Sequence, residues 1–290
     1  MIYLFLTILS STFIILSLKF IEKLRISPLS AIMINYIFAS SAGFLLNSDP
    51  ITFNQIVNAP WFFLTLIIGT IFVLTFYLTA ISMQRAGVSV TIVAARMSVI
   101  IPMVFSMLAY NEHINIYKIL GILLTIAGVS LTVYKKTGEK TDFKAMLLPV
   151  SLFLFLGIAD SVVKFSQAEY GTGQIPSVFT AVIFLISCIT AFTVGLTSKQ
   201  VRNDLKMPKT YLLGGFLGLV NFGSIYFFLQ VLELDILDSS IAFGVNNISI
   251  VLIAVLIAYV FFREKLTRIN YIGIIFSILA VTLLMISNVV

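Results

Sequence analysis

Ten apolar stretches, separated by short connections that hold most of the charge, fill almost the whole chain. They cover residues 2–20, 30–46, 61–83, 88–110, 115–134, 146–166, 176–197, 210–232, 239–261 and 268–288. As helices, runs of this length cross a hydrocarbon core of about 30 Å. The chain is 60% hydrophobic and 10% charged, which excludes a water-soluble domain of 290 residues. The sequence predicts an all-α integral membrane protein with ten transmembrane helices.

One segment of the sequence occurs twice, in two similar copies. Placing Glu112 on Glu264, a shift of 152 residues (264 − 112), superposes two apolar runs joined by a short charged connection, and brings Gly121 onto Gly273 without a gap. Such self-similarity indicates a duplicated structural unit. Each copy is a helical hairpin through the membrane.

The duplication divides the chain into two halves of five expected helices each. We predict a first five-helix repeat over residues 1–134, a polar connecting loop at 135–145 and a second repeat over 146–290. Because five is an odd number, the second repeat enters the membrane in the opposite sense to the first. The fold class predicted is therefore ten transmembrane helices as two inverted five-helix repeats.

Alternate connections differ in charge. The odd-numbered connections carry lysine and arginine, as in Lys23, Arg85 and Arg202, whereas the even-numbered ones carry Glu112, Glu169, Glu233 and other carboxylates. The positive-inside bias places the odd connections in the cytoplasm and both termini on the external side of a cell membrane. A net charge of +6 without a basic stripe does not indicate nucleic-acid binding.

The two hairpins carry a resemblance to a known family. Residues 111–114 read NEHI and are followed by Gly121, and residues 263–266 read REKL and are followed by Gly273. This doubled acidic connection with a following glycine resembles the drug/metabolite transporter superfamily, specifically its ten-helix EamA-like family. The resemblance implies two inverted repeats and the transport of a small molecule. The family's usual proline in the fourth helix is represented here by Pro102, shifted about one turn.

Three charged residues lie within the expected membrane spans. Arg96 stands about two turns into the fourth span, and Asp160 and Lys164 stand one turn apart in the sixth. A buried charge in a membrane costs several kcal/mol unless it meets a counter-ion, water or a ligand. Arg96 is a candidate to bind an anionic substrate group or to form an ion pair. Asp160 with Lys164 is either the proton-coupling site or a static i,i+4 pair.

Polar uncharged residues in the spans are further candidates for substrate binding. They are Asn35, Tyr77, Asn221, Asn246 and Asn247. Side-chain amides in hydrocarbon need partners, so lining of a cavity and hydrogen bonding between helices are equally good interpretations. Glu112 and Glu264 are interpreted as shaping their turns, and His113 as a solvated residue.

The function predicted is secondary transport of a small organic metabolite, such as an amino acid or a drug, by alternating access. Protons are one candidate for the coupling ion. The alternative is a channel or lipid scramblase. A membrane-embedded enzyme is a weaker alternative, because one histidine and one cysteine leave almost no residues for a metal site or a nucleophile relay. We expect no cofactor, no metal and no catalytic residue. The expected partners are the substrate and the lipid bilayer, with the protein a monomer.

Overall fold

The computed structural model describes residues 2–24, 26–47, 52–85, 88–112, 114–132, 143–170, 176–262 and 267–287. Every regular element in this part is an α-helix: α1 (Ile2–Lys23), α2 (Pro28–Leu45), α3 (Phe53–Val57), α4 (Phe62–Arg85), α5 (Val88–Met97), α6 (Ile100–Ala109), α7 (Ile116–Thr132), α8 (Phe143–Tyr170), α9 (Pro176–Gly195), α10 (Lys199–Asp204), α11 (Pro208–Glu233), α12 (Ser239–Phe262) and α13 (Arg268–Ser287). Predictions made for Glu264, His113 and residues 135–142 lie outside the described residues.

Six helices in the described part of the chain are long and apolar enough to cross a membrane. They are α2, α4, α8, α9, α11 and α13. Four shorter apolar helical stretches accompany them among the described residues, at Ile2–Ile14, Ala94–Ala109, Ile116–Leu131 and Ser239–Ile253. The all-α membrane fold is thus confirmed. The number of ten spans stays a prediction.

The chain forms two compact units, and each unit draws on both halves of the sequence. Unit 1 comprises Met1–Leu74 and Phe165–Glu233, and unit 2 comprises Thr75–Lys164 and Leu234–Val290. Each unit is therefore formed by the packing of helices that are distant in sequence.

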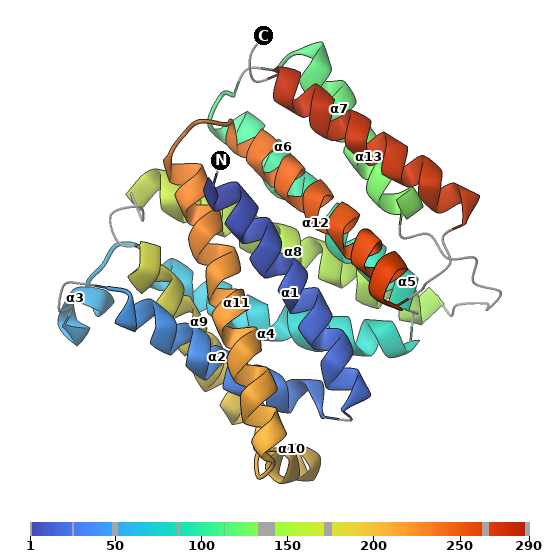
Figure 1. Ribbon diagram of the computed structural model, residues 1–290. Coiled ribbons are helices and arrows are strands. Elements are labelled where there is room, and N and C mark those ends of the chain that lie inside the picture. Colours follow the sequence, from blue (N-terminus) through green and yellow to red (C-terminus); the bar gives the residue numbers. More distant parts are fainter. Residues whose placement is uncertain are drawn as a thin grey trace. The chain divides into compact units, whose positions relative to one another are not determined.

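In unit 1, α2 packs closely on α9 and α11 (Figure 1). Glycines at Gly214 and Gly218 in α11 allow this approach, because a Cβ on Gly218 would stand 2.5 Å from the carbonyl oxygen of Asn35. Small residues four apart are a common means of bringing membrane helices together. The buried side chains of α2 and α9, including Ile34 and Phe184, supply the apolar core of the unit.

In unit 2, α7 and α13 form an antiparallel pair (Figure 1). The Asn115 side chain donates to the carbonyl of Ser287 at one end, at 3.0 Å. The Asn270 side chain donates to the carbonyl of Leu131 at the other end, at 3.1 Å. Between these ends the two backbones approach closely, because a Cβ on Gly128 would lie 2.8 Å from the backbone nitrogen of Ser277.

The expected single helix over 88–110 is wrong in one respect, since it consists of α5 and α6 with a break at Ser98 and Val99. Pro102, in the first turn of α6, is the physical reason. Proline has no amide hydrogen for the carbonyl of residue i−4 and is accommodated in the first turn of a helix. Two short helices, α3 and α10, were also not predicted and lie in connections that the sequence analysis treated as loops.

Candidate polar site in unit 2

The break between α5 and α6 frees a backbone carbonyl that α12 then binds. In a continuous helix the carbonyl of Arg96 would accept from the amide of Ile100, but these residues lie in different helices. The side-chain amide of Asn247 on α12 donates to the Arg96 carbonyl at 2.7 Å instead. Broken helices persist in membranes where neighbouring helices satisfy the freed groups in this way.

The side chains of Arg96 and Asp160 are half-buried in unit 2 and act on each other electrostatically. Asp160 comes from α8, which packs closely on α6, because a Cβ on Gly157 would collide with the side chain of Ile101. Within the described part of the chain, neither charged group makes a side-chain hydrogen bond or a direct ion pair. Their donors and acceptors are therefore open to water or a ligand.

Asn246 and Asn247 have different surroundings although they are adjacent. Asn247 is engaged with the Arg96 carbonyl, whereas Oδ1 of Asn246 is buried without a hydrogen-bond partner among the described residues. A buried acceptor without a partner is costly, so it marks a place where water or a ligand would be stabilised. The Asn247 side chain thus joins α12 to α5, whereas Oδ1 of Asn246 remains open.

The predicted pairing of Asp160 with Lys164 is not what the structure presents. Lys164 lies over the ring of Tyr110, with its Nζ 5.0 Å from the ring centroid, and Glu112 and Asp235 are the carboxylates that act on it. Asp160 acts instead on Arg96. The two residues, although one turn apart on α8, therefore belong to different polar groups.

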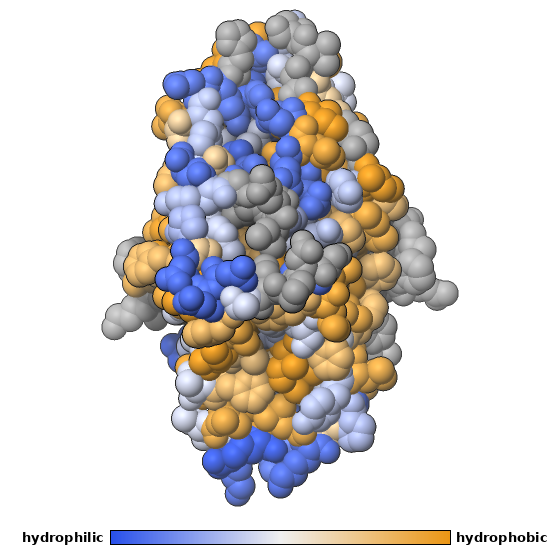
Figure 2. All heavy atoms as spheres, turned by 90° about the vertical axis from the view of Figure 1, so that its left-hand side faces the viewer, coloured by the Kyte–Doolittle hydropathy of each residue, from blue (hydrophilic) through white to orange (hydrophobic). Residues whose placement is uncertain are grey.

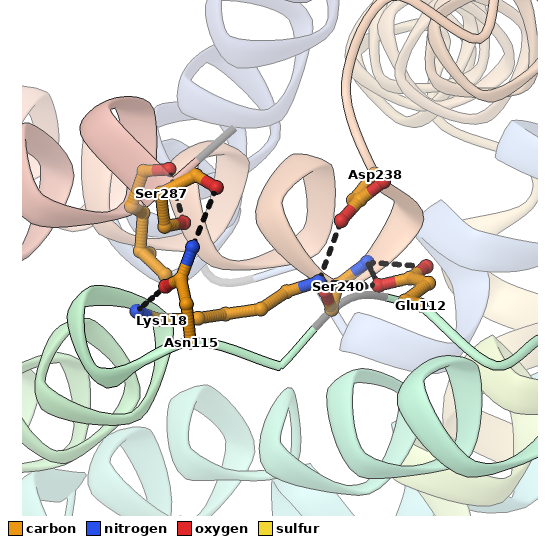
Figure 3. A network of polar contacts seen from close by, with 7 residues as sticks. Glu112, Asn115, Lys118, Asp238, Ser240 and Ser287 are labelled. Atoms are coloured by element: carbon orange, nitrogen blue, oxygen red, sulfur yellow. Dashed lines mark hydrogen bonds and ion pairs between the residues drawn. The ribbon is translucent and has the colours of Figure 1, made fainter. Parts of the chain in front are cut away.

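Lys118 is the centre of the second polar group, which Figure 3 shows. Its side chain is fully buried, and its Nζ lies 2.9 Å from Glu112 Oε2 and 2.6 Å from Asp238 Oδ2. Glu112 also accepts hydrogen bonds from the hydroxyl and, at 3.3 Å, the backbone amide of Ser240, the second residue of α12. This Lys118 network joins the α6–α7 connection to the start of α12.

The backbone at this end of unit 2 includes two residues in the left-handed region. Asn111 has φ 50° directly after the C-cap of α6, and Asp235 has φ 48° in the connection that follows α11. Asparagine and aspartate adopt this conformation more readily than other side chains, and it ends helices. The residue type at each of these two turns therefore favours the observed conformation.

The remaining predicted site residues are Asn35, Asn221 and Tyr77. Asn35 and Asn221 belong to unit 1, where the Asn221 amide donates to Asn35 Oδ1 at 3.1 Å and so joins α11 to α2. Tyr77 on α4 has 53% of its surface exposed and is not part of the buried polar group. Lys118 and Asp238 were not among the predicted site residues, although a lysine beside an otherwise acidic connection was a signal for them.

Comparisons with known proteins agree with the resemblance carried by the two hairpins. An uncharacterized protein of Haemophilus influenzae is 26% identical over 284 residues, which is 94% of this chain and 94% of that protein. A solved crystal structure with 12% sequence identity shares the fold, with a TM-score of 0.77 over 99% of this chain and 96% of that one. The model of the EamA-like transporter family matches residues 1–134 and 144–286. The chain belongs to this family of the drug/metabolite transporter superfamily and is a multi-pass membrane protein of the small-molecule transporter class.

Proposed function

We propose that the protein is a secondary transporter that moves a small organic metabolite by alternating access, with Arg96 binding an anionic group of the substrate. The observation that carries this proposal is the pair of half-buried charges, Arg96 and Asp160, which act on each other without direct contact. Charges inside membrane spans are expensive and are retained chiefly at functional sites. The open acceptor of Asn246, next in sequence to Asn247, is a neutral polar group that a ligand can also bind.

Alternating access by inverted repeats is supported by the packing of α7 on α13. Gly121 meets Leu284 and Gly128 meets Ser277, so seven residues forward along α7 correspond to seven residues back along α13. An antiparallel pair with one helix from each half is what a two-fold axis in the membrane plane would produce. Ten spans, with both termini external, complete the proposed topology.

Asp160 is the proposed proton carrier, because it is the carboxylate that neighbours Arg96 within unit 2. Protonation of Asp160 would leave the guanidinium of Arg96 uncompensated, and an anionic substrate group would then bind there more favourably. Substrate and proton binding would in this way be coupled through one charge pair.

The experiment uses the purified full chain in proteoliposomes. A thermal-shift screen against metabolites first identifies a ligand, since a ligand stabilises according to its concentration relative to its Kd. We expect saturable uptake of that ligand with counterflow, which a channel or scramblase does not give. Chemical conversion of the ligand would instead indicate an enzyme.

Arg96→Ala tests the site itself. We expect this variant to fold and to lose uptake and ligand-induced thermal stabilisation, because the anionic group loses its charge partner, whereas Arg96→Lys should retain part of both. Elution as a folded monomer by gel filtration and an unchanged circular dichroism spectrum provide the folding control. Normal transport by a folded Arg96→Ala variant would show that the substrate binds elsewhere.

A further inference from the structure

The connection between α9 and α11 in unit 1 carries a concentration of exposed positive charge. Its cations are Lys199, Arg202, Lys206 and Lys209, all of them exposed, and together they are called the α10 patch below. They fall within a span of eleven residues that includes the short helix α10.

The local fold keeps the single carboxylate of this connection away from the patch. Val201 and Asp204 form the inward face of α10 and are 1% and 5% exposed. The Asp204 carboxylate accepts from the backbone amide of Ser27 at 2.7 Å and from the Ser30 hydroxyl at 3.2 Å, at the start of α2. Its charge is therefore used to stabilise a helix N-terminus. The outward face of α10 remains cationic.

The cations themselves have few protein partners. Lys209 donates to the carbonyl of Leu24 at 2.9 Å, and Arg202 makes a long contact of 3.4 Å with the carbonyl of Leu196. Among the described residues, Lys199 and Lys206 have no hydrogen bond or ion pair. Their ammonium groups are free to bind an anion outside the protein.

Exposed apolar side chains flank the patch along the chain. They include Leu196, Met207, Tyr211 and Leu212, which are 46%, 39%, 47% and 78% exposed. Figure 2 shows hydrophilic side chains gathered at the lower end, where Figure 1 places α10, directly below a band of hydrophobic ones. Since α9 and α11 both contain candidate membrane spans, this junction of apolar and cationic surface lies at a bilayer boundary.

We propose that the α10 patch is a binding surface for the phosphate headgroups of anionic phospholipids. Lysine and arginine close to a bilayer are attracted to anionic lipids, and apolar side chains beside them contact the acyl chains of the same molecules. The inward-turned Asp204 removes the repulsion that a carboxylate on this face would cause. The surface holds α10 along the leaflet and adds a lipid requirement to the protein.

The test measures which lipids the purified full chain retains. The protein in neutral detergent is offered equal mole fractions of phosphatidylglycerol and phosphatidylcholine, and retained lipids are counted by native mass spectrometry. Wild type should retain phosphatidylglycerol preferentially, and the preference should fall at high salt because screening weakens it. Lys199→Gln with Lys206→Gln should lower the preference about fivefold for each lysine removed.

Two control variants distinguish lipid binding at the α10 patch from a general effect of positive charge on the protein. Lys199→Arg with Lys206→Arg keeps both charges and should keep the preference. Arg85→Gln removes one exposed cation from unit 2 and should change the preference by less than about twofold, because Arg85 is the one lysine or arginine of its connection.

The proposal is overturned by any of three results. The first is an absence of phosphatidylglycerol preference in the wild type. The second is a loss of this preference in the Arg85→Gln variant as large as that for each lysine removed from the α10 patch. The third is full displacement of the lipid by millimolar inorganic phosphate. The last result would mean that the patch is a site for soluble anions. A preference lost only in the Lys199 and Lys206 glutamine variant supports the surface.

Discussion

At the scale of single residues, the fourth expected span shows how one backbone break arranges several side chains. The carbonyl of Arg96 accepts from Asn247, and the guanidinium of the same residue interacts with Asp160. Asn246, adjacent to Asn247 on α12, has an open acceptor. Pro102 is the origin of the arrangement, because the helix cannot continue through it with all its hydrogen bonds. Two testable consequences follow at this scale.

The first concerns Asp160, the proposed proton carrier. We expect Asp160→Asn to abolish accumulation of substrate driven by a proton gradient, because an amide cannot carry a proton, and to leave substrate exchange at least partly active. Uptake with and without an imposed pH gradient measures both. Asp160→Glu keeps a titratable group and is the matched control. Accumulation against a gradient by the asparagine variant would place the coupling elsewhere.

The second concerns the two adjacent asparagines on α12. Asn247→Leu leaves the Arg96 carbonyl without its partner and should lower the free energy of unfolding by about 1–2 kcal/mol. Asn246→Leu removes a group whose Oδ1 already lacks a partner in the described structure, so it should cost less than about 0.5 kcal/mol. Thermal unfolding in one detergent compares them. Equal losses of stability would contradict the assigned hydrogen bond.

At the scale of helices and connections, unit 2 is held at one end by charge and along its length by close backbone approach. Lys118, in the first turn of α7, joins the α6–α7 connection to the start of α12 through Glu112 and Asp238. Asn115 adds a bond to the last turn of α13 and caps α7 by accepting from the Lys118 amide. Three helices, α7, α12 and α13, and the α6–α7 connection thus meet at one polar network.

The two carboxylates of the Lys118 network should contribute unequally to stability. The Glu112 side chain is 8% exposed, whereas that of Asp238 is 37% exposed. Breaking a buried ion pair costs about 3–5 kcal/mol, and solvent-exposed pairs contribute about 0–1 kcal/mol. Glu112→Gln should therefore lower the melting temperature much more than Asp238→Asn does. Similar shifts for both variants would mean that the network is solvated.

At the scale of the whole molecule, the charge pattern of the connections predicts the orientation. The basic connections, including the α10 patch, are predicted to be cytoplasmic, and the acidic ones external. The proposed lipid surface would then face the cytoplasmic leaflet, which is the leaflet richer in accessible anionic headgroups in many membranes. Orientation and lipid contact can be tested independently.

Cysteine labelling tests the orientation. Cys188, the one cysteine of the chain, is replaced by serine to give a silent background. We then expect Glu169→Cys to react with a membrane-impermeant maleimide on intact cells, and Arg202→Cys to react only after the membrane is opened. Both residues are exposed, so the reaction reports the side of the membrane on which each cysteine lies. The opposite pattern would invert the assignment.

The sequence by itself determined the all-α membrane class and the family. Apolar run length predicts membrane helices whatever their packing, and the doubled hairpin at Glu112 and Glu264 carries the family resemblance that the family match confirms. Arg96 and Asp160 were also identifiable from sequence alone, because a charge in an apolar run is costly wherever the helix lies.

Only the tertiary structure decided which polar groups meet. Asp160 acts on Arg96 rather than pairing with Lys164, and Lys118 binds Asp238 across 120 positions of sequence. It also decided that Asn247 binds a carbonyl freed by the α5–α6 break while Asn35 and Asn221 join two helices of unit 1. Helical periodicity gives neighbours one turn away on the same helix, whereas these contacts depend on which faces of separate helices pack together.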